Sequence, residues 1–422
     1  MEIKNRLTLL RNLLAEQDIS AMIIPSNDPH FGEYGPDYYK TIEWLTGFTG
    51  EAGTLVVAQE SAALWTDSRF FVQAEAQLQG TGVQLMKLKV EGTPSIQQWL
   101  KENLQEGDIV AMDEELFSYQ EYSSMVDELS PLTPSLIEDP FDVIWEDRPS
   151  LQFNPIRYVD ETITGESVAS KHSRLVDRLS GPVPFAYIVT ALDEICWLCN
   201  IRGTDVEYNP LVLSYAVVTP ENIHLFLMEQ MMEASAINIL SEQGVIFHPY
   251  EDIVKFLTNL PKDCIRIYSS GKISAKNFFA SMENIHHNAP FAPYAADPMT
   301  GGVLANMKAV KNEVELAGFR KAYVEDAKAQ IKFFNWIKEN VNNGITEYQA
   351  ALKLIEFRSE CPDYLGESFP PIVAYGPNAA LPHYGPSEEV SSVIQPKGFL
   401  LIDTGAHYTY GTTDTTRTLA VG

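Results

Sequence analysis

The last part of the sequence holds two aspartates, Asp403 and Asp414, within a stretch that is typical of a β-hairpin. Two runs rich in apolar residues, threonine and tyrosine flank a turn near residues 409–411. A loop of even length pairs residues whose numbers have an odd sum, and the numbers of the two aspartates have an odd sum. We therefore expect both carboxylates on one face of the hairpin, directly or diagonally opposed, with Cβ atoms roughly 5 to 8 Å apart.

Two carboxylates on one buried face repel each other unless a positive group lies between them. They can share a proton, pair with a base or bind a metal. Carboxylate oxygens suit divalent cations such as Mn²⁺, Mg²⁺ or Zn²⁺, and a bridging pair suits two metals ~3.5 to 4 Å apart. The apolar run of residues 400–402 favours a buried Asp403. Two solvated aspartates are the alternative, and the spacing alone leaves both interpretations open.

Two segments upstream of the hairpin share one order of predicted elements. The first has a strand at 21–24, Trp44, and a hairpin over 54–57 and 63–65. The second has corresponding elements, which are a strand at 186–189, Trp197, and strands at 215–218 and 223–227. This order predicts a diverged duplication, with α/β domains at residues 1–158 and 159–303.

The remaining residues, 304–422, contain the elements that must position the two aspartates. The apolar spacing over residues 312–336 predicts a long amphipathic helix. Thr346 is the expected N-cap of the next helix. Residues 370–375 are expected to form a strand that ends at a Gly-Pro-Asn turn.

Composition limits the classes of partner and compartment. The net charge is −27, from 30 basic and 57 acidic residues, which argues against nucleic acid or an anionic membrane as a partner. The sequence has no apolar run of ~18 residues and no apolar signal-peptide core, so a cytoplasmic protein is expected. Four cysteines fit a reducing compartment. Cys196 and Cys199 have C-x-x-C spacing but lie in an apolar run, which favours buried structural thiols over a redox or zinc site.

Several motifs in one order give the sequence a resemblance to a known family. They are residues 25–34 (PSNDPHFGEY), 47–54 (GFTGEAGT), 64–70 (LWTDSRF), 189–197 (VTALDEICW), 200–210 (NIRGTDVEYNP), 375–384 (YGPNAALPHY), 402–406 (IDTGA) and 411–418 (GTTDTTRT). Together they resemble the pita-bread metallopeptidases and, more narrowly, the long, three-domain Xaa-Pro aminopeptidases. The resemblance covers the whole chain. It implies an α/β chain with two creatinase-amino-terminal-like domains, followed at 304–422 by the first part of a pita-bread α+β catalytic domain.

The resemblance also implies a chemistry for the hairpin. Asp403 would bind one of two divalent metal ions, most often Mn²⁺, and Asp414 would bridge both, so that an activated hydroxide attacks the carbonyl before a proline. His383 would hydrogen-bond the peptide and stabilise the tetrahedral intermediate. Thr416 and Arg417 would orient the aspartates, although an ordinary surface arginine is the alternative for Arg417. The implied partners are peptides with proline at the second position and a second copy of the chain.

The sequence departs from the family pattern at its end. In the family one histidine and two glutamates complete the metal site, and all three follow the aspartate hairpin. The chain ends at Gly422, before them. We therefore expect an amino-terminal fragment or truncation that binds metal weakly and is inactive. His407 does not replace these ligands, because it lies roughly 13 Å along the strand from Asp403.

Two other functions stay open at this point. A catalytically dead pita-bread scaffold that binds peptides or proteins, like the histone-chaperone relative, is disfavoured by Asp403, Asp414 and His383. A prolidase or creatinase is disfavoured by the duplicated amino-terminal domain.

Four polar residues upstream of the hairpin also need an interpretation. Asp67 and Arg69 are expected to form a structural ion pair or turn. The sequence assigns no role to His30 or Glu33, although either could approach a site across a domain or subunit boundary.

Overall fold

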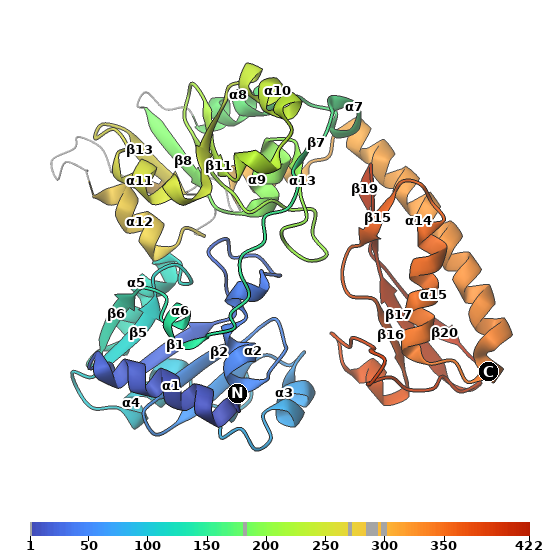
Figure 1. Cartoon of the computed structure of the whole chain (residues 1–422), viewed down its shortest axis with the longest axis horizontal. Helices are drawn as coiled ribbons and strands as arrows, with labels where there is room; N and C mark the ends of the chain where they lie inside the picture. The colour runs from blue at the N-terminus through green and yellow to red at the C-terminus, as the bar shows by residue number, and fades with distance from the viewer. Residues whose placement is uncertain (1, 180–183, 269–271, 284–293, 297–301) are drawn as a thin grey trace. The chain divides into compact units, whose positions relative to one another are not determined.

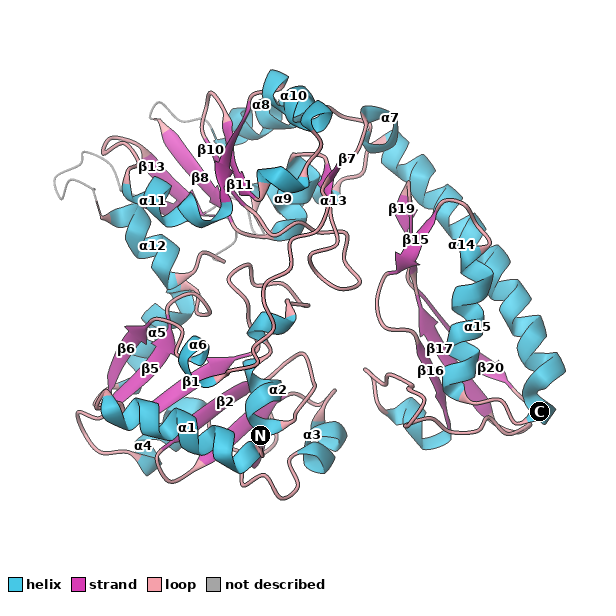
Figure 2. Ribbon diagram, viewed as in Figure 1, coloured by secondary structure: helices cyan, strands magenta, loops and turns pink. Residues whose placement is uncertain are grey.

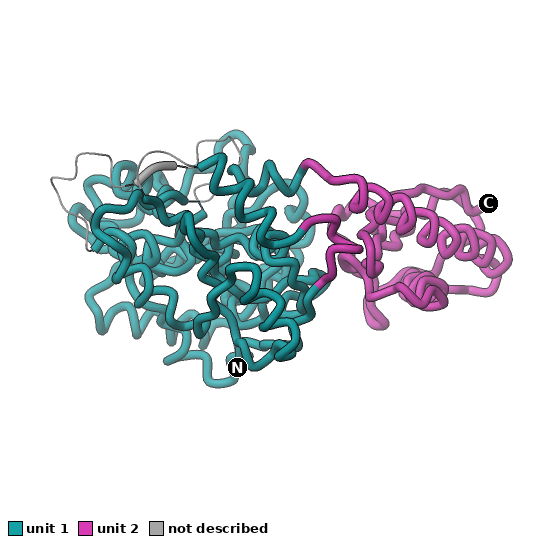
Figure 3. The backbone as a smooth tube through the Cα atoms, turned by 90° about the horizontal axis from the view of Figure 1, so that it is seen from above, with its two compact units in different colours: residues 1–158, 167–309 teal, residues 159–166, 310–422 magenta. Residues whose placement is uncertain are grey.

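The computed structural model describes residues 2–179, 184–268, 272–283, 294–296 and 302–422 (Figure 1). The chain divides into two compact units, which Figure 3 distinguishes by colour. Unit 1 comprises residues 1–158 and 167–309, and unit 2 comprises residues 159–166 and 310–422. Unit 1 contains two six-stranded sheets, one in each of the first two predicted domains, and a two-stranded sheet. The three-domain boundaries at 158/159 and 303/304 remain a proposal.

The first sheet of unit 1 has six strands in the order β4-β3-β2-β1-β5-β6. These strands are β1 (Ala21–Pro25), β2 (Thr54–Ala58), β3 (Ala62–Thr66), β4 (Gln84–Lys87), β5 (Ile109–Asp113) and β6 (Thr133–Ile137). The accompanying helices are α1 (Ile3–Glu16), α2 (Thr41–Thr46), α3 (Phe71–Gln77), α4 (Ile96–Asn103), α5 (Tyr119–Leu129) and α6 (Phe141–Ile144). Alternate residues of β1 enter different cores, because Met22 packs with Leu10 of α1 whereas Ile23 packs with Trp99 of α4. The sheet is therefore buried on both faces (Figure 2).

The second sheet of unit 1 has the order β12-β11-β10-β8-β13-β14. Its strands are β8 (Phe185–Val189), β10 (Tyr215–Val218), β11 (Ile223–Leu227), β12 (Val245–Pro249), β13 (Ile265–Tyr268) and β14 (Tyr294–Ala296). Its helices are α8 (Val168–Leu179), α9 (Leu192–Leu198), α10 (Ala234–Glu242), α11 (Ile253–Thr258), α12 (Ala275–Met282) and α13 (Val303–Ala309). A separate two-stranded sheet pairs β7 (Arg157–Tyr158) with β9 (Ile201–Arg202). In each sheet, the first strand in sequence lies between two neighbours. β1 is antiparallel to β2 and parallel to β5, and β8 is antiparallel to β10 and parallel to β13. The two sheets thus share one topology, as the predicted duplication requires.

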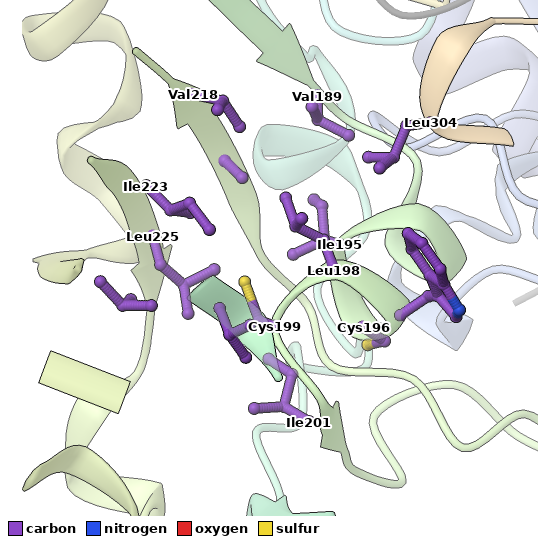
Figure 4. Packing of buried hydrophobic residues seen from close by; sticks show 14 of the residues in the cluster. Val189, Ile195, Cys196, Leu198, Cys199, Ile201, Val218, Ile223, Leu225 and Leu304 are labelled. Atoms are coloured by element: carbon purple, nitrogen blue, oxygen red, sulfur yellow. The ribbon is translucent and has the colours of Figure 1, made fainter. Parts of the chain in front are cut away.

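The C-x-x-C pair belongs to the core of the second sheet. Cys196 and Cys199 are free, buried thiols among apolar side chains such as Ile195 (Figure 4). Burial raises the pKa of the Cys196 thiol to about 11, and the amide of Val212 donates to its sulfur over 3.4 Å. The predicted structural role of both cysteines is confirmed.

Unit 2 consists of helices packed against two small sheets. The helices are α7 (Glu161–Thr164), α14 (Glu313–Asn340) and α15 (Glu347–Ser359). One sheet has the order β16-β17-β20, and its strands are β16 (Ile372–Tyr375), β17 (Phe399–Thr404) and β20 (Thr415–Ala420). The other has the order β15-β18-β19, and its strands are β15 (Tyr364–Glu367), β18 (Ala406–Tyr408) and β19 (Gly411–Thr412). Helices α14 and α15 lie side by side (Figure 1). Thr346 caps α15 in a capping box with Gln349, as predicted.

The two faces of the β16-β17-β20 sheet have different neighbours. Ile402 on one face packs with Phe333 of α14 and Leu354 of α15. Leu401 on the other face packs with Tyr384, in the segment that follows β16. Asp403 follows the alternation of Leu401 and therefore lies on this second face. The helices support the strand from behind and leave its carboxylate on the side of the 376–392 segment.

No helix in the described part of the chain combines the length and the apolar character needed to cross a bilayer.

The start of α14 offers a test of this packing. Asn312 caps α14 in a capping box with Glu315, and its side-chain amide donates to the carbonyl of Thr164 over 2.8 Å. Asn312→Ala should destabilise unit 2 by about 1–2 kcal/mol, because it removes the cap and the link to α7. Hydrogen exchange of the first turns of α14 measures this loss. Asn342→Ala, at an exposed position, is the matched control, and equal effects of the two variants would contradict the assignment.

Candidate metal centre

The aspartate hairpin has the predicted register. Asp403 lies opposite Thr416, and the pairing continues on the far side of the bend with His407 opposite Thr412. This register places Asp414 opposite Gly405, two positions from the partner of Asp403. The two aspartates are therefore diagonal neighbours across the hairpin, and Cβ atoms of such a pair lie roughly 7 Å apart.

Gly405 lies where the hairpin passes from one sheet to the other. A Cβ atom at this position would be 2.1 Å from the carbonyl oxygen of Thr413 and 2.2 Å from Oγ of Ser368. The carbonyl of Gly405 accepts a hydrogen bond from the amide of Ser368 over 3.0 Å. Only glycine allows this close approach, so Gly405 fixes the bend between the two aspartates.

The charges of the two aspartates interact. Partial burial and the negative charge of Asp403 raise the pKa of Asp414 above its ordinary value. Thr416 Oγ1 donates a 2.7 Å hydrogen bond to Asp403 Oδ1. A cation or a proton placed between the carboxylates relieves their repulsion, and carboxylate oxygens are ligands for hard or borderline divalent cations.

Thr416 and Arg417 have different positions relative to the aspartates. Thr416 contacts Asp403 directly. Arg417 is exposed, lies opposite Ile402 in the register, and donates from Nη1 to the Thr416 carbonyl over 2.7 Å. Among the ion pairs of the described residues, none joins Arg417 to either aspartate. The structure thus brings Thr416, but not the Arg417 guanidinium, to the carboxylates.

His383 lies in the segment that covers the Asp403 face of the sheet. It is partly buried and precedes Tyr384, which packs on Ile372 of β16. Strand β16 is the neighbour of β17 on the side away from β20, and its Ile372 lies directly opposite Asp403. The structure therefore places the His383 segment on the same face as the first aspartate.

The other polar residues that the sequence singles out lie elsewhere. His407 shares a 2.8 Å hydrogen bond between Nδ1 and Thr412 Oγ1 at the far end of the hairpin. Asp67 and Arg69 form a bidentate ion pair with bonds of 3.0 and 2.8 Å, as expected of a structural pair. His30 is buried within unit 1, where its ring contacts the Thr190 carbonyl and the Tyr250 hydroxyl, each over 2.9 Å. Glu33 lines a pocket of unit 1 together with Arg69.

A buried arginine that sequence reasoning missed supports the strand of Asp403. Arg358 of α15 donates to Thr404 Oγ1 over 3.0 Å and to the Gly405 carbonyl over 3.2 Å. It also donates to Asp326 over 2.8 Å and pairs with Glu367. Burial lowers the pKa of Arg358, but the two carboxylates outweigh burial and raise it overall. Arg358 thus fixes the backbone directly after Asp403.

The residues fit a divalent metal site in part. Asp403 and Asp414 supply the carboxylate pair that such a site requires. Among the described residues, no group of three or more His, Cys, Asp or Glu side chains is placed to hold a metal ion. Two carboxylates therefore account for only part of a coordination shell.

Comparisons with known proteins bear on this geometry. Residues 6–139 and residues 147–315 each match a model of the creatinase/prolidase N-terminal domain, and residues 317–422 match metallopeptidase family M24. A probable Xaa-Pro aminopeptidase P of Coprinopsis cinerea is 31% identical over 434 residues, which cover 100% of this chain and 69% of the relative. The chain belongs to the Xaa-Pro aminopeptidase P family. The implied fold of two creatinase-like domains and a pita-bread domain is confirmed.

Other members of the Xaa-Pro aminopeptidase P family match over similar lengths. Xaa-Pro aminopeptidase ApepP of Drosophila melanogaster is 34% identical, and the match covers 99% of this chain and 68% of the length of that relative. The crystal structure of X-prolyl aminopeptidase from Caenorhabditis elegans has a TM-score of 0.90 at 30% identity, and the match covers 100% of this chain and 70% of that one. The nematode protein is described as a cytosolic enzyme with a di-nuclear active site.

The repulsion between the aspartates predicts a pH-dependent effect on stability. A raised folded-state pKa of Asp414 means that the repulsion acts above that pKa and disappears as the pH falls through it. In the metal-free chain, Asp414→Asn should raise the melting temperature at pH 7 by no more than about 2 °C, because exposed charges interact weakly. The difference should vanish near pH 3. A gain of the same size at both pH values would contradict the repulsion.

Proposed function

We propose that this protein is an Xaa-Pro aminopeptidase, which hydrolyses the peptide bond between an amino-terminal residue and a following proline. The observation that carries the proposal is the carboxylate pair of Asp403 and Asp414 in the M24 segment, with the His383 segment on the same face. Relatives named Xaa-Pro aminopeptidase support it along the whole chain. The Xaa-Pro bond is a tertiary amide with restricted geometry, so a dedicated site suits it.

The proposed cofactor is a pair of divalent metal ions, and Mn²⁺ is the proposed metal. Asp403 would hold one ion and Asp414 would hold both, while the Thr416 hydroxyl fixes the orientation of Asp403. Arg417 acts through the backbone by holding the carbonyl of Thr416. When bound, the metals supply an activated water and polarise the scissile carbonyl. The nematode relative with a di-nuclear site supports two ions.

His383 is the proposed catalytic residue outside the metal pair. Its imidazole donates a hydrogen bond to the peptide and to the negative charge that develops in the tetrahedral state. A donor that is already in place for this charge costs no reorganisation during the reaction. Its position on the Asp403 face supports this role.

The proposed function implies particular substrates, a location and an oligomeric state. Peptides with proline at the second position are the proposed substrates, and the net charge of −27 argues against nucleic acid and anionic membranes as partners. A cytoplasmic location is supported by the nematode relative, which is described as cytosolic. A homodimer is proposed from the resemblance alone.

The test of the proposed function is hydrolysis of Ala-Pro-Ala by the 422-residue chain with Mn²⁺, with Ala-Ala-Ala as the control peptide. Cleavage of the first bond of the proline peptide alone, with a fall to background in Asp403→Asn, which removes a metal-binding charge, is the result that would support the proposal. Full activity of Asp403→Asn would rule out the metal assignment. No hydrolysis by the wild-type chain would contradict the proposal and agree with the expectation from sequence that the chain is inactive.

The role of His383 is tested separately. His383→Ala should reduce kcat about 10²-fold or more, because a hydrogen bond to the developing charge is lost, while Mn²⁺ binding is unchanged. His407→Ala is the matched control, since His407 lies at the far end of the hairpin, and it should retain nearly the full rate. Normal turnover of His383→Ala would return His383 to a structural role.

A further inference from the structure

The first residue of α15 is a fully buried carboxylate. Glu347 is 0% exposed and directly follows the N-cap, Thr346. A buried carboxylate is costly unless hydrogen bonds satisfy its oxygens. Its place at the positive end of the helix dipole favours the negative charge. The partners of Glu347 therefore show what this charge is used for.

Four groups donate to Glu347, and all lie in one segment of unit 2. Oε1 accepts from the amide of Tyr375 over 2.5 Å. Oε2 accepts from the Tyr384 hydroxyl over 2.8 Å and from the amide of Ser392 over 2.7 Å. The Asn378 side-chain amide donates to both oxygens, over 3.2 and 3.0 Å. One carboxylate thus holds the beginning, the middle and the end of the segment that carries His383.

The same segment has little regular structure of its own. After the short 3₁₀ helix over Gly376–Ala380, no strand or helix is present until β17 begins at Phe399. Its other anchors include the packing of Leu381 and Tyr384 on the sheet. The start of α15 also contacts the segment, because the Glu347 amide donates to the Ser392 carbonyl over 3.0 Å and the Tyr348 amide donates to Ser391 Oγ over 2.9 Å. A long loop that carries a functional residue must be held by a rigid element, and here that element is α15.

The hydrogen bonds around Glu347 are charge-assisted and mutually connected. The Asn378 amide also reaches the Tyr384 hydroxyl and Ser392 Oγ, each over 3.1 Å. Burial, the hydrogen bond to Glu347 and its charge raise the pKa of Tyr384, so the hydroxyl stays a donor. Bonds to an ionised acceptor are stronger than neutral ones, and removal of the charge weakens every bond in the cluster.

We propose that Glu347 is the positioning residue for His383, because it fixes the segment 375–392 on the Asp403 face of the sheet. The inference rests on the proposed function, in which His383 contacts the peptide. Asp403 is positioned differently, by Thr416 and through the contacts of Arg358 to Thr404 and Gly405. Loss of Glu347 should therefore affect His383 and leave the aspartates in place.

The test compares Glu347→Gln with the wild-type chain by hydrogen exchange and NMR. Glutamine keeps the shape but replaces an acceptor oxygen with an amide that faces donors. We expect exchange over residues 376–392 to rise at least tenfold, with no change over 399–420, and a shift of the His383 imidazole signal. Glu356→Gln, at an exposed position of α15, is the control and should change neither. Unchanged exchange over 376–392, or an equal rise over both ranges, would overturn the proposal.

Activity and metal binding provide the second readout. In Glu347→Gln, kcat on Ala-Pro-Ala should fall at least tenfold, while Mn²⁺ affinity stays within twofold of the wild type. The double variant Glu347→Gln/His383→Ala should have the same kcat as His383→Ala alone, since both substitutions remove the same function of His383. A fully additive loss would contradict positioning through His383. If the chain does not hydrolyse the peptide at all, the proposed function fails, and hydrogen exchange still decides the role of Glu347.

A milder variant covers the case in which Glu347→Gln does not fold. Tyr384→Phe removes a single donor to Glu347 and leaves the carboxylate and its other partners. It should raise exchange over 376–392 by about threefold or more without a change over 399–420. No change in this variant would overturn the proposal.

Discussion

The hairpin register brings two carboxylates together, and the buried contacts of unit 2 fix the strands that carry them. Asp403 and Asp414 are diagonal neighbours, and the raised pKa of Asp414 reflects partial burial and the charge of Asp403. A fold holds such a pair only if other interactions fix the strands on which the aspartates lie. The bend at Gly405 and the contacts of Arg358 with the Thr404 hydroxyl and the Gly405 carbonyl fulfil that requirement.

Helix α15 connects the two functional segments. Glu347 in its first turn binds the His383 segment, and Arg358 in its last turn binds the strand that carries Asp403. Both charges are buried, Arg358 in ion pairs with Asp326 and Glu367 and Glu347 in hydrogen bonds, so their contacts keep a fixed geometry that exposed groups do not provide. The distance between the two segments is thereby set by one rigid helix, which suits a site that must align a peptide with a metal pair.

Residue patterns predicted the local features well because these depend on neighbours in sequence. The parity of the hairpin, the cap at Thr346, the buried Cys196 and the duplicated strand order all follow from short-range spacing. The long helix extends to Asn340 rather than Trp336, because Ile337 continues its apolar face. These elements position the site, and the sequence was sufficient to predict them.

The support of the site could not be predicted in the same way. Arg358 and Glu347 lie on an amphipathic helix, where charged residues usually face solvent. Their partners are 9 to 47 positions away along the chain, and no local motif indicates such pairs. The exposed position of Arg417, which the resemblance assigns to the support of the aspartates, likewise depends on the register and on the packing of the opposite face.

The most direct measurement of the central claim is a Mn²⁺ titration of the chain at pH 7, followed by the EPR signal of free Mn²⁺. The account predicts binding that is at least tenfold weaker in Asp403→Asn and in Asp414→Asn, and that weakens as the pH falls and the carboxylates take up protons. Equal Mn²⁺ affinity in the wild type and in both variants would contradict the assignment of these aspartates as a metal-binding pair.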